Sequence, residues 1–192
     1  MKFSLFTAAT ALCTLASGMV ILDLDMDLER DQELDITPQR KIFRPAIAII
    51  IREAYPDTHY PPTNWAKVCR TNGSNNVKTL LGFYIPACSG TCTISFSDAS
   101  KVSGSHQMQL FTTGGYPAYG NTWNKKPYTD IHKGTFETSE DGPGPATVLA
   151  DYGLKFPCPK AATSYGFEVQ PVNDNDCIVW DITKGGFIIT CG

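Results

Sequence analysis

The chain has 192 residues, enough for one well-buried domain once a leader is subtracted, and its net charge is −3. Seven acidic residues lie between Asp23 and Asp35, and without residues 1–35 the chain carries 14 basic and 12 acidic residues. A nearly neutral body lacks the basic stripe that displaces counterions from phosphates. We therefore expect no nucleic-acid partner.

The N-terminus has the pattern of a secretory signal peptide over residues 1–18. Lys2 is followed by an apolar run over residues 3–15 and by small side chains at 16–18, where a signal peptidase would cut. The run is shorter than the roughly 20 apolar residues that cross a bilayer, and no later segment is long enough. The sequence therefore predicts a secreted protein, extracellular or associated with a cell wall, with no membrane partner.

Residues 19–41 form an acidic leader without aromatic side chains, and it ends near the basic pair Arg40-Lys41. The leader is either a propeptide that is removed during secretion or a solvated arm that stays attached. Under both interpretations we expect this N-terminal segment to be disordered or weakly structured.

The next residues, 42–79, are interpreted as an N-terminal extension. The Ile-rich stretch after Pro45 fits either a short helix closed by Pro56 or a buried strand. A connector rich in proline and aromatic residues follows. The polar loop after Cys69 holds an N-glycosylation sequon at Asn72, which implies an exposed position if the protein is a secreted glycoprotein.

Residues 80–192 have the pattern of a β-sandwich domain. Apolar side chains alternate with polar ones, as in Cys92, Ile94 and Phe96, and period-two alternation places one face of a strand in a core. Turn residues separate the stretches. The expected strands are 80–85, 91–97, 107–113, 133–138, 146–150, 163–170, 177–182 and 186–191. The fold class predicted is all-β, an antiparallel β-sandwich stapled by disulfides.

Of seven cysteines, one leaves with the signal peptide, and the others are Cys69, Cys88, Cys92, Cys158, Cys177 and Cys191. An even number in a secreted chain predicts three disulfides. A metal site is disfavoured because Cys88 and Cys92 have no second closely spaced Cys or His pair, and we expect no cofactor. Cys177 and Cys191 flank an expected hairpin and are predicted to pair. Because this pairing leaves both hairpin faces apolar, either the hairpin is buried on both sides or the bridge is wrong.

Eight motifs follow one another between residues 80 and 191: GFYIPA, GTCTISF, MQLFTT, NTWNKKPYTDIHKGTF, GPATV, YGLKFPCP, SYGFEVQP and WDIT. In this order they resemble the motifs of the fungal ubiquitin-3-binding-protein C-terminal domain family. The resemblance implies a compact β-sandwich from a filamentous fungus, in a family of largely secreted or wall-associated proteins without an assigned activity. It also implies that Cys92 pairs with Cys158, which leaves Cys69 to pair with Cys88.

The ubiquitin in this family name is not carried over to the chain. A disulfide-rich protein behind a signal peptide does not meet cytosolic ubiquitin in the ordinary course. The resemblance implies no catalytic residue either.

No recognisable catalytic set is present. His59, His106 and His132 lie in connector or turn segments without the elbow motif of a serine hydrolase, and fully paired cysteines leave no thiolate. Two acidic groups could supply the carboxylate pair of a glycan hydrolase. They are Glu137, Glu140 and Asp141, and Asp174, Asp176 and Asp181. Acids in such turns are ordinary, so a secreted glycan hydrolase is kept as the alternative function.

A Gly/Asn/Pro-rich loop carries the residues that we predict for binding, which are Tyr116, Tyr119, Trp123 and Tyr128. Exposed rings could stack on sugar faces or anchor a protein. Alternatively the rings fold inward and cap one end of the sandwich, and the free energy of burying apolar surface favours this arrangement.

These patterns together predict a secreted, non-enzymatic protein with a structural or recognition role at the cell wall or outside the cell. Its partner would be a cell-wall polysaccharide or a host surface protein, as expected of a small secreted effector. We expect the protein to be a monomer.

Overall fold

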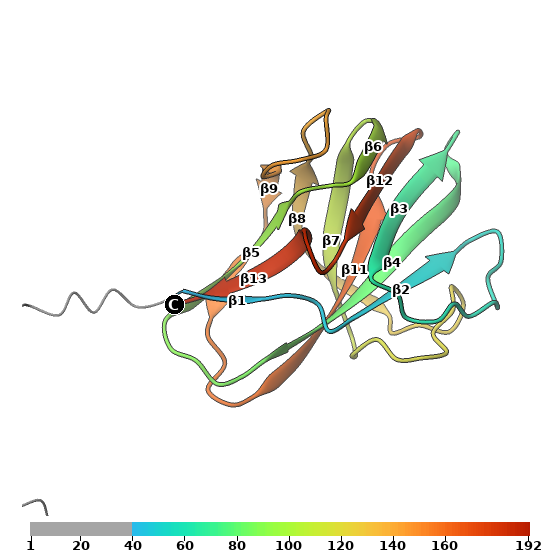
Figure 1. Cartoon of the computed structure of the whole chain (residues 1–192). Helices are drawn as coiled ribbons and strands as arrows, with labels where there is room; N and C mark the ends of the chain where they lie inside the picture. Colours follow the sequence, from blue (N-terminus) through green and yellow to red (C-terminus); the bar gives the residue numbers. More distant parts are fainter. Residues whose placement is uncertain (1–39) are drawn as a thin grey trace, which may run out of the picture. The chain divides into compact units, whose positions relative to one another are not determined.

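A computed structural model describes residues 40–192 (Figure 1). The expected signal peptide (1–18) and all of the acidic leader before residue 40 lie outside the described residues. Within the described part the chain forms strands, turns and loops without a helix, and every strand pair is antiparallel. Residues 40–192 thus contain no helix that is long and apolar enough to cross a membrane. The all-β, antiparallel prediction is confirmed.

The strands form two sheets. The small sheet contains, in spatial order, β1 (Lys41–Phe43), β13 (Gly186–Cys191), β5 (Thr91–Ser97) and β10 (Lys155–Pro157). The large sheet contains β6 (Lys101–Gly104), β12 (Asp176–Asp181), β3 (Trp65–Thr71), β4 (Ser74–Ile85), β11 (Thr163–Pro171), β7 (Gln107–Thr113), β8 (Thr129–Glu137) and β9 (Thr147–Asp151). One further strand, β2 (Ile47–Arg52), also pairs with β4. All eight expected strands are present, and β4 and β8 begin earlier than predicted.

Aromatic rings join the two sheets in the main core. Phe96 and Phe187 of the small sheet pack edge to face, with ring centroids 5.0 Å apart. Trp180 and Phe136 of the large sheet reach the same rings at 5.4 and 5.1 Å. Edge-to-face packing suits the ring quadrupoles, and all four side chains are buried. The alternation of the strands thus delivers one apolar face from each sheet to a shared layer.

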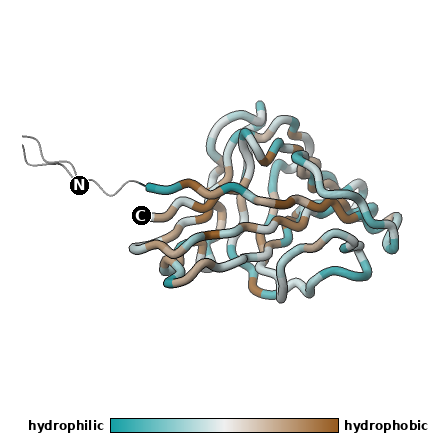
Figure 2. Tube along the Cα trace, turned by 60° about the horizontal axis from the view of Figure 1, so that its bottom comes forward, coloured by the Kyte–Doolittle hydropathy of each residue, from teal (hydrophilic) through white to brown (hydrophobic). Residues whose placement is uncertain are grey.

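A second, smaller apolar cluster lies on the opposite, outer face of the large sheet. Ala48 belongs to the main core, whereas its neighbour Ile49 points the other way and packs with Ile51 and Leu80. Figure 2 shows hydrophobic colour running along individual strands and hydrophilic colour gathered at loop tips. Because Ile49, Ile51 and Leu80 lie outside the main core, this outer face needs a cover of its own.

Residues 42–79 contribute strands to the large sheet. The stretch after Pro45 is the strand β2 and not a helix, and it pairs with β4 over residues 77–82. The polar loop after Cys69 is a tight hairpin, in which Asn72 and Gly73 have φ of 49° and 72°. Two consecutive positive φ values are typical of a type I′ turn, which Asn-Gly favours. The sheet therefore already includes β2 and β3, before residue 80.

Candidate binding site

The loop of residues 114–128 lies across the outer face of the large sheet, over a pair of glycines. Gly82 and Gly166 are directly opposite one another on β4 and β11. A Cβ at Gly82 would overlap the ring of Tyr116, and one at Gly166 would overlap the carbonyl oxygen of Gly115. The absence of side chains at these two positions lets the loop lie flat on the sheet.

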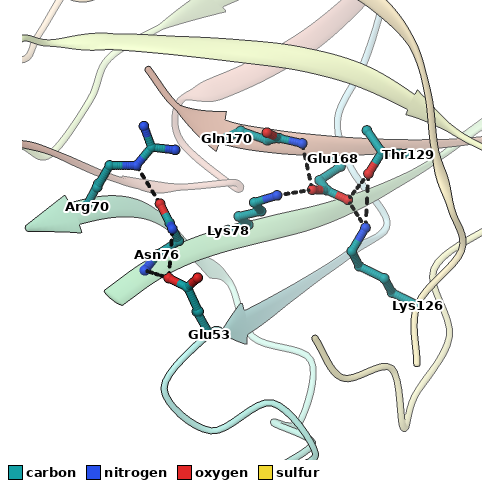
Figure 3. Close-up of polar contacts among 8 residues, drawn as sticks. All are labelled: Glu53, Arg70, Asn76, Lys78, Lys126, Thr129, Glu168 and Gln170. Carbon is teal, nitrogen blue, oxygen red and sulfur yellow. Dashed lines mark hydrogen bonds and ion pairs between the residues drawn. The ribbon is translucent and has the colours of Figure 1, made fainter. Parts of the chain in front are cut away.

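Glu168 is the centre of the contacts between this loop and the sheet (Figure 3). Its side chain is fully buried, and its two carboxylate oxygens accept four hydrogen bonds. Lys78 Nζ donates at 2.9 Å, Gln170 Nε2 at 2.8 Å and Thr129 Oγ1 at 2.8 Å. Lys126, which belongs to the loop, donates the fourth. Four donors saturate the lone pairs of a carboxylate.

The contacts with Lys78 and Lys126 lower the pKa of Glu168. Desolvation alone would raise the pKa, but the charges of Lys78 and Lys126 and their hydrogen bonds outweigh it and hold the pKa below its ordinary value. Glu168 is therefore ionised and fully occupied at neutral pH, so it is unavailable as a proton donor. Its role is to hold the loop onto the sheet.

A second set of polar contacts lies on β4, the strand that also carries Lys78 (Figure 3). Asn76 donates from its backbone and from its side chain to Glu53 Oε2, at 2.8 and 2.7 Å, and accepts a hydrogen bond from Arg70. Glu53 begins the connector that follows β2, and the loop binds this connector through Asn124, whose backbone N–H donates to Pro56 O at 3.0 Å. Hydrogen bonds thus join the loop, the connector and the sheet to one another.

The four predicted binding residues divide into two inward and two outward rings. Trp123 is partly buried against the cluster of Ile49, Ile51 and Leu80, and Lys78 Nζ lies 4.8 Å from its ring centroid. Tyr116 lies over Gly82 and is 38% exposed. In contrast, Tyr119 and Tyr128 are 68% and 67% exposed. The inward rings cover the outer face of the large sheet, and do not cap an end of the sandwich.

Further rings on this face were missed in the sequence. Tyr84 is 53% exposed, and the alternation of β4 places it on the same face as Gly82. Tyr119 meets His59 edge to face, with ring centroids 5.5 Å apart. The sequence carried a signal for Tyr84, which alternates with the apolar Phe83 and Ile85 in the expected strand, whereas the contact with His59 joins segments 60 residues apart.

The predicted carboxylate pairs are only partly brought together. Asp176 and Asp181 begin and end β12, so at ~3.3 Å per residue they lie roughly 17 Å apart along the strand. This exceeds the separation of about 5–9.5 Å that glycosidases use. Asp181 is also bound to the turn at Thr183. Glu137 and Glu140, in contrast, line one hollow of about 330 Å³ together with His106.

Within residues 40–192 two disulfides are formed, and neither is a predicted pair. Cys69 bonds to Cys177 and Cys92 bonds to Cys191, in each case across directly paired positions of neighbouring strands. The predicted Cys177–Cys191 bridge is wrong because β12 belongs to the large sheet and β13 to the small one. The pairings implied by the resemblance, Cys92 with Cys158 and Cys69 with Cys88, are also not formed, since each core cysteine already faces another.

The remaining cysteines, Cys88 and Cys158, have free thiols beside the Cys92–Cys191 bridge. The four sulfurs lie within 4.8 Å of one another. Desolvation and the neighbouring Cys158 sulfur raise the pKa of the Cys88 thiol to about 11. This convergence could not be seen in the sequence, because Cys158, after β10, and Cys191, at the end of β13, are far from Cys88 and Cys92 along the chain. Such a set could bind a metal only with the bridge reduced, since metals bind thiolates.

The glycosylation sequon lies at the tip of the β3–β4 hairpin. Asn72 is exposed there, and Ser74 Oγ donates to Thr71 O at 3.2 Å. An exposed hairpin tip is accessible to modification, and glycosylation of Asn72 stays a prediction.

The chain was compared with known protein families and with curated proteins. A family model described as "Ubiquitin 3 binding protein But2 C-terminal domain" matches residues 44–180. No curated protein sequence is significantly similar to the chain. The family match begins just before β2 and ends within β12, so it starts earlier than the expected residue 80, includes β2, β3, the loop and the Glu168 contacts, and stops short of β13. Because the match covers more than half of the 192 residues, the protein belongs to the But2 C-terminal domain family.

Proposed function

We propose that this protein is exported and acts without catalysis, binding a cell-wall polysaccharide or a host surface protein through the outer face of its large sheet. The observation that carries the proposal is that Tyr119 and Tyr128 are about two-thirds exposed on a loop held in place by buried contacts. Rings presented by an ordered loop lose little conformational entropy on binding.

The chemistry of the surface supports recognition of a large ligand. Tyrosine rings offer an apolar face for stacking and a hydroxyl for hydrogen bonding, which suits both sugars and protein side chains. Tyr84 adds a third exposed ring from the sheet itself. The family description names ubiquitin binding, which is a protein-binding property of that family; for an exported chain with disulfides we propose an extracellular partner instead.

The test is to express the full chain and to measure pull-down of the secreted protein on chitin, on glucan and on intact fungal walls. The double variant Tyr119→Ala/Tyr128→Ala should lower binding about tenfold or more, since each stacked ring contributes ~1 kcal/mol. Trp123 is a poor choice because it packs on the second apolar cluster and its loss would disturb the fold.

Tyr152→Ala is the matched control, because Tyr152 is 62% exposed on a different loop. Equal losses in the control and the double variant would contradict a specific role for the loop. Wild-type retention on none of the three materials, combined with capture of a host surface protein, would assign the face to protein binding.

The alternative function, a secreted glycan hydrolase, is favoured by one observation. Glu137 and Glu140 line the same hollow, and Glu137 accepts a hydrogen bond from Gln107 Nε2 at 3.0 Å. If these two acids form the catalytic pair, Glu137→Gln and Glu140→Gln should each abolish release of reducing sugar, while Asp141→Asn should not. Failure of the wild-type protein to release sugar from chitin, glucan or wall material would count against this alternative.

A further inference from the structure

The cysteine cluster beside the C-terminal strand contains more reactive groups than the two disulfides use. Cys92 and Cys191 face one another in the register of β5 and β13 and are bonded. Cys158 Sγ lies 3.2 Å from Cys92 Sγ, and Cys88 Sγ lies 3.9 Å from it. Two unbonded thiols are therefore held against a closed bridge.

The backbone around these two thiols holds them together from both sides. Cys88 N donates to Pro159 O at 3.0 Å, and Cys158 N donates to Gly90 O at 3.1 Å. These reciprocal hydrogen bonds join the turn between β4 and β5 to the segment after β10. All four sulfurs lie within 4.8 Å of one another. A change of side-chain rotamers can therefore bring the Cys88 and Cys158 sulfurs to bonding distance, while the two backbone segments stay where they are.

The cluster is accessible from outside. A hollow of about 610 Å³ is lined by Cys88, Cys191 and Lys41, among others. Cys88 is only partly buried, whereas Cys92 and Cys191 are 0% and 2% exposed. A small oxidant can therefore reach the Cys88 thiol without opening the core.

We propose that Cys88 and Cys158 close a third disulfide, which lies against Cys92–Cys191 in the secreted protein. The two thiols lose two protons and two electrons, and a disulfide oxidant of the glutathione type takes them up and leaves as two thiols. A thiolate of one residue first attacks the oxidant to give a mixed disulfide, and the second cysteine then displaces the leaving thiol. The new bridge joins the β4–β5 turn to the chain after β10.

The inference depends on export into an oxidising compartment and on no particular ligand. Export is tested separately, by expression of the full chain and recovery of its processed form from the culture medium. Failure to bind any polysaccharide would leave the bridge unaffected, and absence of the bridge would leave the binding test unaffected.

The first measurement counts thiols in the secreted protein, alkylated under denaturing conditions without reduction. The wild-type chain should show none, and Cys88→Ser and Cys158→Ser should each show one, while the double variant should again show none. Two alkylated positions at Cys88 and Cys158 in the wild-type protein would overturn the proposal. So would four alkylated positions with one zinc ion per chain in metal analysis, which would assign the cluster to metal binding.

The second measurement identifies which sulfurs pair. Trypsin leaves Cys88 and Cys92 in one peptide, because no Lys or Arg lies between Lys78 and Lys101. The variant Ser89→Lys, at an exposed turn position, introduces a cut between the two cysteines. Unreduced digests should then link Cys88 to Cys158, and Cys92 to Cys191. The reduced digest of the same variant is the control, and a Cys92–Cys158 link would overturn the pairing. Fragmentation of the wild-type peptides in tandem mass spectrometry gives the same answer if the variant does not fold.

Discussion

Two buried carboxylates of the large sheet differ in their surroundings, because only one of them is paired with lysines. Glu168 is fully buried and accepts hydrogen bonds from four donors, two of them lysines. Asp176, at the start of β12, is 3% exposed; polar groups of Val172, His106 and Ser105 lie near its carboxylate, but none of them meets it in full hydrogen-bond geometry. Burial alone therefore does not set the behaviour of an acid, because Lys78 and Lys126 form ion pairs with Glu168, whereas no lysine or arginine of residues 40–192 forms one with Asp176.

The two acids have pKa values shifted in opposite directions. Desolvation raises the pKa of Asp176 from 3.8 to about 6, although nearby groups of Val172, His106 and Ser105 offset it in part. The pKa of Glu168 lies below 4.5, because the lysine charges outweigh desolvation. Asp176 therefore makes the folded state lose stability as pH rises from about 4 to about 6. Glu168 stabilises the fold above about pH 4.5, and this contribution is lost as pH falls through its lowered pKa.

The largest effect is expected when the partners of Glu168 are removed. The double variant Lys78→Met/Lys126→Met leaves a buried carboxylate without a cation, and it should lower the free energy of unfolding by ~3–5 kcal/mol. Urea denaturation at neutral pH measures the change. The triple variant that also carries Glu168→Met is the matched control. It should recover most of the lost stability, since three packed methionine side chains need no ionic partner. A double variant as stable as the wild-type protein would contradict the role of the ion pairs.

An effect of opposite sign is expected at the unpaired acid. Asp176→Asn removes the penalty for a buried charge and should stabilise the protein by roughly 3 kcal/mol at about pH 7.5, and by much less near pH 4. Thermal unfolding across this range checks both points. Asp174→Asn, at an exposed position two residues earlier, should leave the pH profile unchanged. A D176N protein that is less stable at neutral pH would show that the carboxylate has a partner.

The smallest effect is expected for Lys126→Met alone, which leaves Glu168 paired with Lys78. The loss of one charged hydrogen bond should cost ~1–3 kcal/mol and loosen the loop over Trp123. Quenching of tryptophan fluorescence by acrylamide should increase, because Trp123 becomes more accessible. Lys125→Met, at an exposed neighbouring position, is the control. Unchanged quenching would mean that the loop is held by its other contacts.

Local sequence patterns were sufficient to predict the positions of most strands, but they did not predict which strands pair. The alternation in 91–97 and 107–113 predicted β5 and β7 within the observed bounds. The short strands β1, β6 and β10 were missed, because three or four residues carry too little periodicity. The loop that we predict for binding was singled out from its composition, but Glu168 was not, since a single Glu in a strand carries no local sign of two distant lysines.

The amino-acid sequence was sufficient to predict the all-β class and most strand and turn positions, while the export signal stays a prediction. The separation of the consecutive strands β12 and β13 into different sheets, and hence the pairing of the cysteines, became visible only in the fold. The fold also decided which rings of the loop turn inward. The physical reason is that alternation reports which face of a strand is buried, whereas strand partners are chosen by contacts between residues far apart in the chain.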